Sequence, residues 1–151
     1  MGKEARIIFR KLTLADAESA AELDFKSFSK EDSWASEDFF NAAMDEHEEF
    51  LVAELNGKII ACAGAEIFPD GAEIESIAVD PDFRRQGIGR RLLAKMIEAI
   101  LKRGVNLVIL EVRPSNKAAI RLYEKFGFEI VERLKNYYPN EDAWVMAREF
   151  Y

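Results

Sequence analysis

The fold of this chain is decided by residues 77–93, which read IAVDPDFRRQGIGRRLL. The first residues are typical of a β-strand, Asp80-Pro81 ends that strand, and apolar residues at helical spacing begin after Gly89. A helix N-terminus binds anions, because its first N–H groups have no intrahelical partner and the helix dipole favours negative charge there. The stretch therefore predicts an α/β fold with an anion site at the turn from strand to helix.

The residues of this turn narrow the choice of anion. Gly87 and Gly89 let the backbone approach a diphosphate closely. Four arginines surround them: Arg84, Arg85, Arg90 and Arg91. A P-loop needs Gly-Lys-Ser/Thr, which is absent here, and a dinucleotide fingerprint needs a third glycine where Leu92 stands. Taken alone, the turn fits either a phosphate site or an ordinary basic helix end.

The rest of the chain predicts one mixed α/β domain that spans residues 1–151. Helices are expected at about 14–28, 35–46, 89–103 and 115–127. Strands are expected at about 6–10, 50–55, 58–68, 72–79, 105–112, 128–135 and 143–150. This order combines antiparallel hairpins with a central βαβ unit, and the most apolar strand, 105–112, should lie inside the sheet.

Composition and charge exclude several classes of protein. The chain is 49% hydrophobic and 32% charged, as in ordinary globular domains, and its formal net charge of −7 argues against a nucleic-acid partner. It has no run of about 18 apolar residues that would span a membrane, and its start lacks the apolar core of a signal peptide. We therefore expect a cytoplasmic protein with no nucleic-acid or membrane partner.

The single cysteine and the single histidine suggest no further chemistry. Cys62 is typical of a small buried residue in a strand, and His47 of a surface residue at a polar helix end. One cysteine cannot form an internal disulfide, and no cluster of metal-ligating residues is visible in the sequence. We expect no metal cofactor.

Three motifs together resemble one family of enzymes. Residues 77–93 resemble the acetyl-CoA motif of the GNAT N-acetyltransferases, and residues 110–128, LEVRPSNKAAIRLYEKFGF, resemble their second cofactor motif. Residues 136–139, NYYP, narrow the resemblance to the RimI-type ribosomal-protein-alanine N-acetyltransferases and related protein N-terminal acetyltransferases. The resemblance covers nearly the whole chain. It implies a GNAT-like α/β fold, with a mixed sheet of six to seven strands and about four flanking helices.

The resemblance also implies acetyl-CoA as the acetyl donor and assigns residues to it. The backbone N–H groups of residues 85–90 would hold the pyrophosphate, and the strand end at 77–79 would splay from its neighbour and pair with the pantetheine arm. The cofactor-binding residues are then Ile77, Ala78, Val79, Arg84, Arg85, Gln86, Gly87, Ile88, Gly89, Arg90 and Asn116.

Acetyl transfer to an amine needs a base, because a free α-amine has a pKa of about 8, and a proton donor for the leaving thiolate. By the strand period of two, Glu111 ends an otherwise apolar row of Val105, Leu107 and Ile109, near the strand end where α/β ligand sites open. From the residues alone, a solvated or arginine-paired carboxylate is an alternative. The resemblance implies that Glu111 is the base.

Tyr123 is the expected acid. Asn116 and Tyr123 are seven residues apart and share one helix face, so a cofactor along that face would meet both. The resemblance implies that Asn116 hydrogen-bonds the cofactor and that Tyr123 protonates the departing sulfur. The alternatives are a helix cap for Asn116 and a core aromatic for Tyr123.

The strand before the turn carries two further acidic residues, one of which could act as a base. Glu73 and Glu75 are expected on one strand face together with Ile77 and Val79. Some GNAT enzymes take their base from this strand, so Glu75 is a rival or helper base close to the acceptor. The alternative is a solvated strand edge.

The resemblance implies a protein or peptide N-terminus as acceptor, a ribosomal protein being one example. Tyr137 and Tyr138 would line the peptide slot, unless they only pack on the sheet, and residues 25–34 would form the opposite wall. Three further carboxylates would favour a cationic acceptor: Glu31, Asp32 and Glu141.

Two other functions stay open. The chain could acetylate a small amine or a lysine side chain, or it could be a non-catalytic acyl-CoA sensor. We expect a monomer or a weak homodimer.

Overall fold

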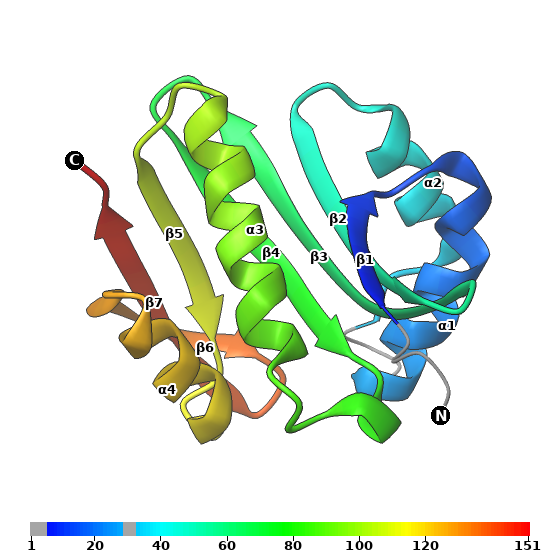
Figure 1. Cartoon of the computed structure of the whole chain (residues 1–151). Coiled ribbons are helices and arrows are strands. Elements are labelled where there is room, and N and C mark those ends of the chain that lie inside the picture. Colours follow the sequence, from blue (N-terminus) through cyan, green and yellow to red (C-terminus); the bar gives the residue numbers. More distant parts are fainter. Residues whose placement is uncertain (1–5, 29–32) are drawn as a thin grey trace.

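The computed structural model describes residues 6–28 and 33–151, and Figure 1 shows their arrangement. The strands are β1 (Ile7–Lys11), β2 (Glu48–Leu55), β3 (Lys58–Phe68), β4 (Gly71–Val79), β5 (Leu107–Val112), β6 (Glu129–Tyr138) and β7 (Glu141–Glu149). The helices are α1 (Ala17–Ser27), α2 (Ser36–Met44), α3 (Ile88–Lys102) and α4 (Lys117–Lys125). Short 3-10 turns cover Leu14–Asp16 and Pro81–Phe83.

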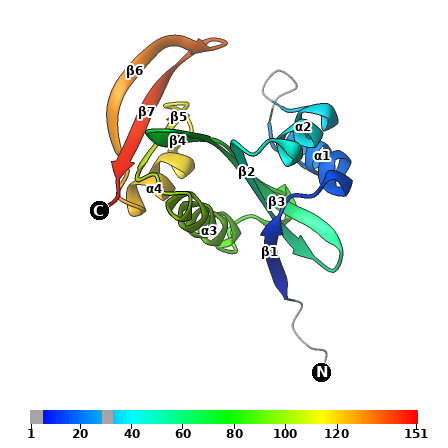
Figure 2. The same ribbon diagram turned by 90° about the horizontal axis from the view of Figure 1, so that it is seen from above.

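The strands form one seven-stranded sheet in the order β1-β2-β3-β4-β5-β7-β6. The β4–β5 pair is parallel and every other pair is antiparallel. Figure 2 shows α1 and α2 on one face of the sheet and α3 and α4 on the other. The element order, the mixed α/β class and the inner position of β5 are therefore as the sequence predicts.

Each face of the sheet has its own hydrophobic core. On one face, α3 buries the apolar positions that its helical period brings to one side, among them Leu92, Leu93 and Met96. On the other face, α1 and α2 cover a second core that includes Phe39, Phe50 and Cys62. Cys62 is thus a buried strand residue, as expected. No helix within residues 6–28 and 33–151 is long and apolar enough to cross a membrane.

The α-helix starts differ from the prediction by one to three residues. The helix α1 begins at Ala17, after a 3-10 turn at Leu14–Asp16, and α2 begins at Ser36. The helix α3 begins at Ile88, because Gly87 adopts a left-handed conformation (φ 76°) and takes the N-cap position. The helix α4 begins at Lys117 rather than at Ser115, because the side chain of Asn116 caps it and accepts a hydrogen bond from the N–H of Ala119 at 3.2 Å.

A β-bulge in β4 overturns one expectation. Ser76 pairs with Gly64 and Ile74 pairs with Ala65, so Glu75 is an extra residue without a partner on β3. The bulge reverses the alternation of side chains along β4. Ile77 packs against the same core as Ile74, whereas Glu73 and Glu75 lie on the opposite face. The prediction that these glutamates share a face with Ile77 and Val79 is therefore wrong.

Gly64, which borders the bulge, makes space for an aromatic ring of the second core. A Cβ atom on Gly64 would lie 2.1 Å from Cζ of Phe50, its partner on β2. The Phe50 ring centroid is 5.4 Å from that of Trp34 and 6.0 Å from that of Phe39. A larger residue at position 64 must displace this ring, and Trp34 with it.

We expect Gly64→Ala to lower the free energy of unfolding by about 1–3 kcal/mol, the usual cost of overpacking a core. Urea denaturation followed by tryptophan fluorescence measures this change. The double variant Gly64→Ala/Phe50→Leu should recover part of the loss, because the smaller side chain vacates the space. Equal midpoints for Gly64→Ala and the parent would show that the ring does not depend on Gly64.

Candidate active site

The two parallel strands separate at the centre of the sheet. The last parallel pair joins Ile74 to Leu110, although β4 continues to Val79 and β5 to Val112. Figure 1 shows the strands diverging toward their C-terminal ends. A cavity of about 250 Å³ lies here. Its lining residues are Phe28, Trp34, Ile74, Glu75, Ser76, Ile77, Glu111, Val112, Arg113, Asn116, Ala119, Tyr123 and Tyr138.

Glu111 stands at this separation, half-buried near the end of β5. The β5 residues alternate between a buried row and a less buried row, and Glu111 ends the latter after Leu107 and Ile109. Val105 lies outside the strand and does not belong to the row. The hydroxyl of Tyr137 donates a hydrogen bond to Oε1 of Glu111 at 3.1 Å, so the carboxylate is held from the β6 side.

Glu73 holds the same carboxylate from the β4 side. Glu73 pairs with Ile109 across the parallel strands, which brings its side chain next to Glu111 on one face of the sheet. Burial, followed by the hydrogen bond to Glu111 and its negative charge, raises the pKa of Glu73 to about 8. The raised pKa favours the protonated form of Glu73, which can donate a hydrogen bond to Glu111.

The helix α4 brings Asn116 and Tyr123 to the cavity wall, together with Ala119 between them. Tyr123 is buried, and this burial raises the pKa of its phenol well above the ordinary value, so the hydroxyl keeps its proton. Asn116 is both the helix cap and a lining residue of the cavity. The cap uses its side-chain oxygen, so its amide N–H groups remain to serve as donors.

The predicted phosphate turn lies between β4 and α3. Arg85 and Gly87 both have positive φ angles, 64° and 76°, and these direct the chain into the helix. The N–H groups of the first helical turn have no intrahelical partner. The side chain of Arg84 is turned back: its Nε donates to the carbonyl of Val79 at 3.1 Å. The turn itself borders the cavity but does not line it.

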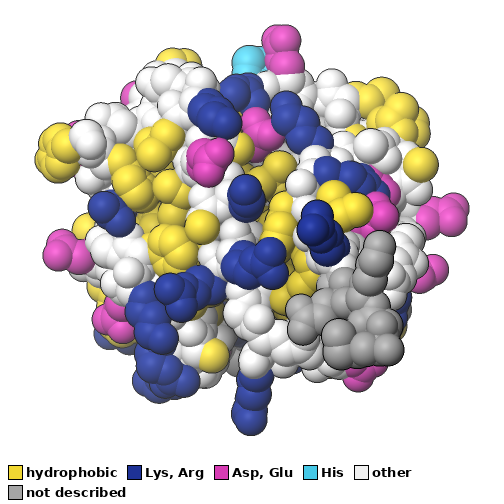
Figure 3. All heavy atoms as spheres, in the orientation of Figure 1, with side chains coloured by type: hydrophobic (Ala, Val, Ile, Leu, Met, Phe, Trp, Pro, Cys, Tyr) yellow, Lys and Arg dark blue, Asp and Glu magenta, His cyan; other side chains and the backbone are white. Residues whose placement is uncertain are grey.

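Positive charge gathers around this turn although the chain is acidic overall. Figure 3 shows Lys and Arg side chains on the lower part of the face that carries α3 and α4. The exposed cations of these elements include Arg84, Arg85, Arg90, Arg91, Lys95, Lys117 and Arg121. The guanidinium of Arg91 lies 4.8 Å from the centroid of the Phe9 ring on β1. This surface suits a polyanionic ligand.

The structure brings six of the predicted residues together around one cavity: Glu111, Tyr123, Ile77, Asn116, Glu75 and Tyr138. Tyr137 does not line the cavity but reaches Glu111 through its hydroxyl. Ala78 is buried on the face of the sheet opposite to Ile77, in the core under α1 and α2. The other predicted cofactor residues do not line the cavity. Val79 ends β4, and residues 84–90 form the turn into α3 and the start of that helix.

The acceptor wall differs in part from the expectation. Phe28 and Trp34 line the cavity from the α1–α2 side, as residues 25–34 were expected to do. Glu141, however, already accepts hydrogen bonds from the N–H and Oγ of Ser115 and from Arg113. Its charge is therefore satisfied within the protein. Residues 31 and 32 lie outside the described residues.

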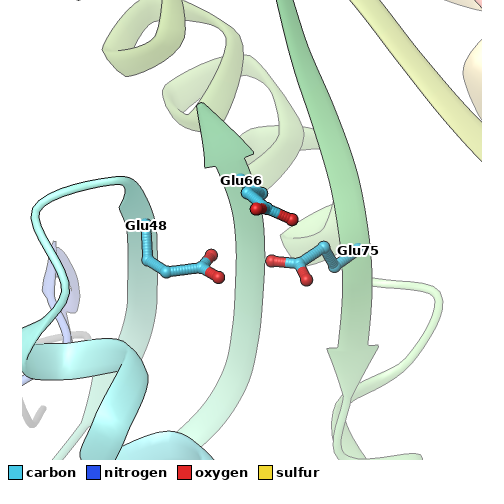
Figure 4. Close-up of side chains that lie close together, drawn as sticks. All are labelled: Glu48, Glu66 and Glu75. Carbon is cyan, nitrogen blue, oxygen red and sulfur yellow. The ribbon is translucent and has the colours of Figure 1, made fainter. Parts of the chain in front are cut away.

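A different carboxylate group, absent from the sequence prediction, lies beside the cavity. Glu48, Glu66 and Glu75 come from three neighbouring strands, and each has a carboxylate oxygen within 4.8 Å of the others. Figure 4 shows the three side chains pointing toward one another. His47, the residue before Glu48, is exposed as expected. Nothing in the local sequence signals this group, because it depends on the strand register.

Burial and mutual repulsion keep a proton within this group. Two carboxylate oxygens of this group, Oε2 of Glu48 and Oε1 of Glu75, are buried and have no hydrogen-bond partner. Burial, followed by the hydrogen bond to Glu75 and its charge, raises the pKa of Glu48 to about 9. The pKa of Glu75 is also raised, mainly by burial. We interpret Glu48 and Glu75 as a pair that shares a proton at neutral pH.

This proton makes the stability of the protein depend on pH. The folded-state pKa of Glu48 lies above its ordinary value of 4.5, so its favourable contribution is complete below that value and is lost as pH rises through about 9. We expect Glu48→Gln to melt at a higher temperature than the parent at pH 9, and at a similar temperature at pH 5. Exposed Glu46→Gln is the control and should follow the parent. Parallel melting curves for Glu48→Gln and the parent across this range would contradict the shared proton.

Comparison with known proteins shows the family to which the chain belongs. Residues 14–128 match the profile of the acetyltransferase (GNAT) family. The chain is 45% identical over 120 residues to the [ribosomal protein bS18]-alanine N-acetyltransferase of Escherichia coli strain K12, covering 76% of this chain and 79% of that protein. It is 35% identical over 144 residues to the N-alpha-acetyltransferase RimI of Mycobacterium tuberculosis, covering 91% and 89%.

A solved structure has the same fold. The crystal structure of the ribosomal-protein-S18-alanine N-acetyltransferase from Escherichia coli superposes with a TM-score of 0.87 at 36% identity, covering 95% of this chain and 94% of that chain. The fold, the strand-to-helix turn and these similarities together show that this chain is an acetyltransferase of the GNAT family, of the RimI type.

Proposed function

We propose that this protein transfers the acetyl group of acetyl-CoA to the α-amine of a protein N-terminus, with Glu111 as base and Tyr123 as acid. The observation that carries the proposal is the meeting of these two groups at one cavity. Glu111 reaches it from β5 and Tyr123 from α4. A carboxylate and a protonated phenol on two walls of one cavity supply the two proton transfers that the reaction needs.

The features that fit acetyl-CoA lie along one path. The N-terminus of α3 and its surrounding cations suit the pyrophosphate. Gly87 supports this use, because its left-handed conformation exposes the loop backbone and no atom lies within 4 Å of a Cβ placed there. The edge of β4 beyond Ile74 is free of β5 and suits the amide groups of the pantetheine arm. Asn116, whose amide can donate, stands opposite this edge on the cavity wall.

The proton steps follow from the two groups. Glu111 removes a proton from the acceptor ammonium, directly or through a water, and so provides a neutral amine. The amine nitrogen attacks the thioester carbonyl and forms the C–N bond, gives up its second proton to water, and the C–S bond then breaks. Tyr123 gives its proton to the departing sulfur and regains one from water. Glu73 and Tyr137 each hydrogen-bond the Glu111 carboxylate and hold it toward the cavity.

The acceptor side favours a peptide N-terminus. The cavity is bounded by Phe28 and Trp34 on one side and by Tyr138 on the other, and an extended chain fits between two aromatic walls. The Escherichia coli relative is named as an N-acetyltransferase of alanine in ribosomal protein bS18, which makes ribosomal proteins the first acceptors to test.

Removing the proton function of Glu111 or Tyr123 should slow the chemical step. Glu111→Gln and Tyr123→Phe keep the shape of each side chain but remove its proton function, so each should lower kcat by about 10²- to 10⁴-fold. Thiol release from acetyl-CoA with an acceptor peptide measures kcat, and titration calorimetry should give an unchanged Kd for coenzyme A. Glu129→Gln, an exposed change on β6, is the control. Parent-like turnover in both variants would refute the assigned mechanism.

Negative charge beside the cavity should give the enzyme a preference for cationic acceptor peptides. Glu75 lines the cavity beside Trp34, and Glu66 and the Glu48–Glu75 pair, which retains one proton, leave net negative charge on this side. A peptide with Arg or Lys at its second residue should therefore exceed its Glu-containing counterpart in kcat/KM by about tenfold, a difference of about 1.4 kcal/mol. The double variant Glu48→Gln/Glu75→Gln, which removes the charge of the pair, should reduce this preference, and Glu129→Gln should not.

Mass spectrometry of the peptides locates the acetyl group. We expect it on the N-terminal amine of free peptides. Exclusive acetylation of internal lysines, or of small amines alone, would replace the proposal by one of those acceptor classes. Tight coenzyme A binding without acetylation of any amine would favour a sensor instead.

A further inference from the structure

Asp80 is the most buried of the charged residues in the described part of the chain, with 1% of its surface exposed. It directly follows β4, and its N–H donates to the carbonyl of Ile60 at 2.8 Å. Its Oδ1 accepts from the N–H of Asp82 at 2.9 Å, and its carbonyl accepts from the N–H of Phe83 at 2.8 Å. These bonds close the turn Pro81–Phe83, which leads directly into the phosphate turn.

The charge of Asp80 is matched by two lysines from other elements. Its Oδ2 lies 3.3 Å from Nζ of Lys26 and 3.7 Å from Nζ of Lys58. Burial alone would raise the pKa of Asp80, but the N–H of Asp82 and the two ammonium groups outweigh it and hold the pKa below its ordinary value. Asp80 is therefore an ionised group inside the protein, which is costly unless its partners stay in place.

The two lysines connect Asp80 to opposite sides of the active site. Lys26 lies in the last turn of α1, and Phe28, two residues later, lines the acceptor side of the cavity. The neighbouring Ser27 also reaches β4, with its Oγ 3.5 Å from the carbonyl of Val79. Lys58 begins β3, and its Nζ lies 5.6 Å from the ring centroid of Phe83, within the turn before the phosphate site.

We propose that Asp80 is a positioning residue that holds the phosphate turn, residues 84–89, for the cofactor and, through Lys26, holds the end of α1 for the acceptor. The acceptor part rests on the function proposed above. The cofactor part needs only that the chain binds coenzyme A. Asp80 acts on both substrates indirectly, through the turn Pro81–Phe83 and the end of α1.

Asp80→Asn tests the proposal, because asparagine keeps the size and the Oδ1 acceptor but loses the charge that holds both lysines. We expect the Kd for coenzyme A, measured by calorimetry without an acceptor, to rise about tenfold. KM for acetyl-CoA and for the acceptor peptide should rise by similar factors, while kcat at saturation stays within about threefold. Asp82→Asn, an exposed change in the same turn, is the matched control.

Two lysine variants separate the two connections. Lys26→Met keeps the aliphatic stem and should raise KM for the acceptor while leaving the Kd for coenzyme A within about twofold of the parent. Lys58→Met should do the reverse, and Lys26→Arg should restore the acceptor KM. These variants also carry the test if circular dichroism shows that Asp80→Asn does not fold.

The outcomes distinguish positioning from a purely structural role. Coenzyme A binding by Asp80→Asn that equals that of Asp82→Asn would overturn the proposal, as would a loss of kcat with both KM values unchanged. Equal effects of Lys26→Met and Lys58→Met on both substrates would overturn the division between the two sides. Because the Kd for coenzyme A is measured without an acceptor, failure to find an acceptor would count against the proposed function alone.

Discussion

The active site depends on the point at which the parallel pairing of β4 and β5 stops. Backbone groups inside a sheet must be paired, so a strand that leaves its neighbour exposes an edge of N–H and C=O groups. Here the pairing stops at Ile74 and Leu110. The gap that follows accommodates a cavity, places Glu111 on one side of it and leaves the edge of β4 on the other. The helix α4 and its cap then complete the cavity wall.

Charge is distributed so that the two substrates would meet opposite fields. The face that carries α3 and α4 is rich in exposed Arg and Lys, although the net charge of the chain is −7. The opposite face of the sheet gathers the carboxyl groups of Glu48, Glu66, Glu73 and Glu75. A polyanionic acetyl donor and a cationic acceptor would therefore approach from different sides and meet at the separation of β4 and β5. Protons retained by Glu73 and Glu48 limit the repulsion among these carboxyl groups.

Local signals explain why so much of the site could be predicted. The turn at 84–89, the helix face shared by Asn116 and Tyr123, and the position of Glu111 near a strand end depend on neighbours within about ten residues. The face of Glu75 could not be predicted in this way. A bulge opposite Gly64 inserts one residue into β4, and strict alternation assigns Glu75 to the wrong face relative to Ile77. Whether the catalytic, cofactor and acceptor residues act as assigned stays a prediction.

By itself, the sequence determined the order of the elements, the GNAT fold and the strand-to-helix turn, because hydrophobic periodicity, glycines and helix caps act over short distances along the chain. Only the tertiary structure decided which groups surround Glu111, and it did so through strand register. Glu73 and Tyr137 reach Glu111 from strands far apart in the sequence, and Asp80 finds Lys26 on a helix 54 residues earlier. Contacts of this kind follow from how strands pair across the sheet, which no local pattern of residues contains.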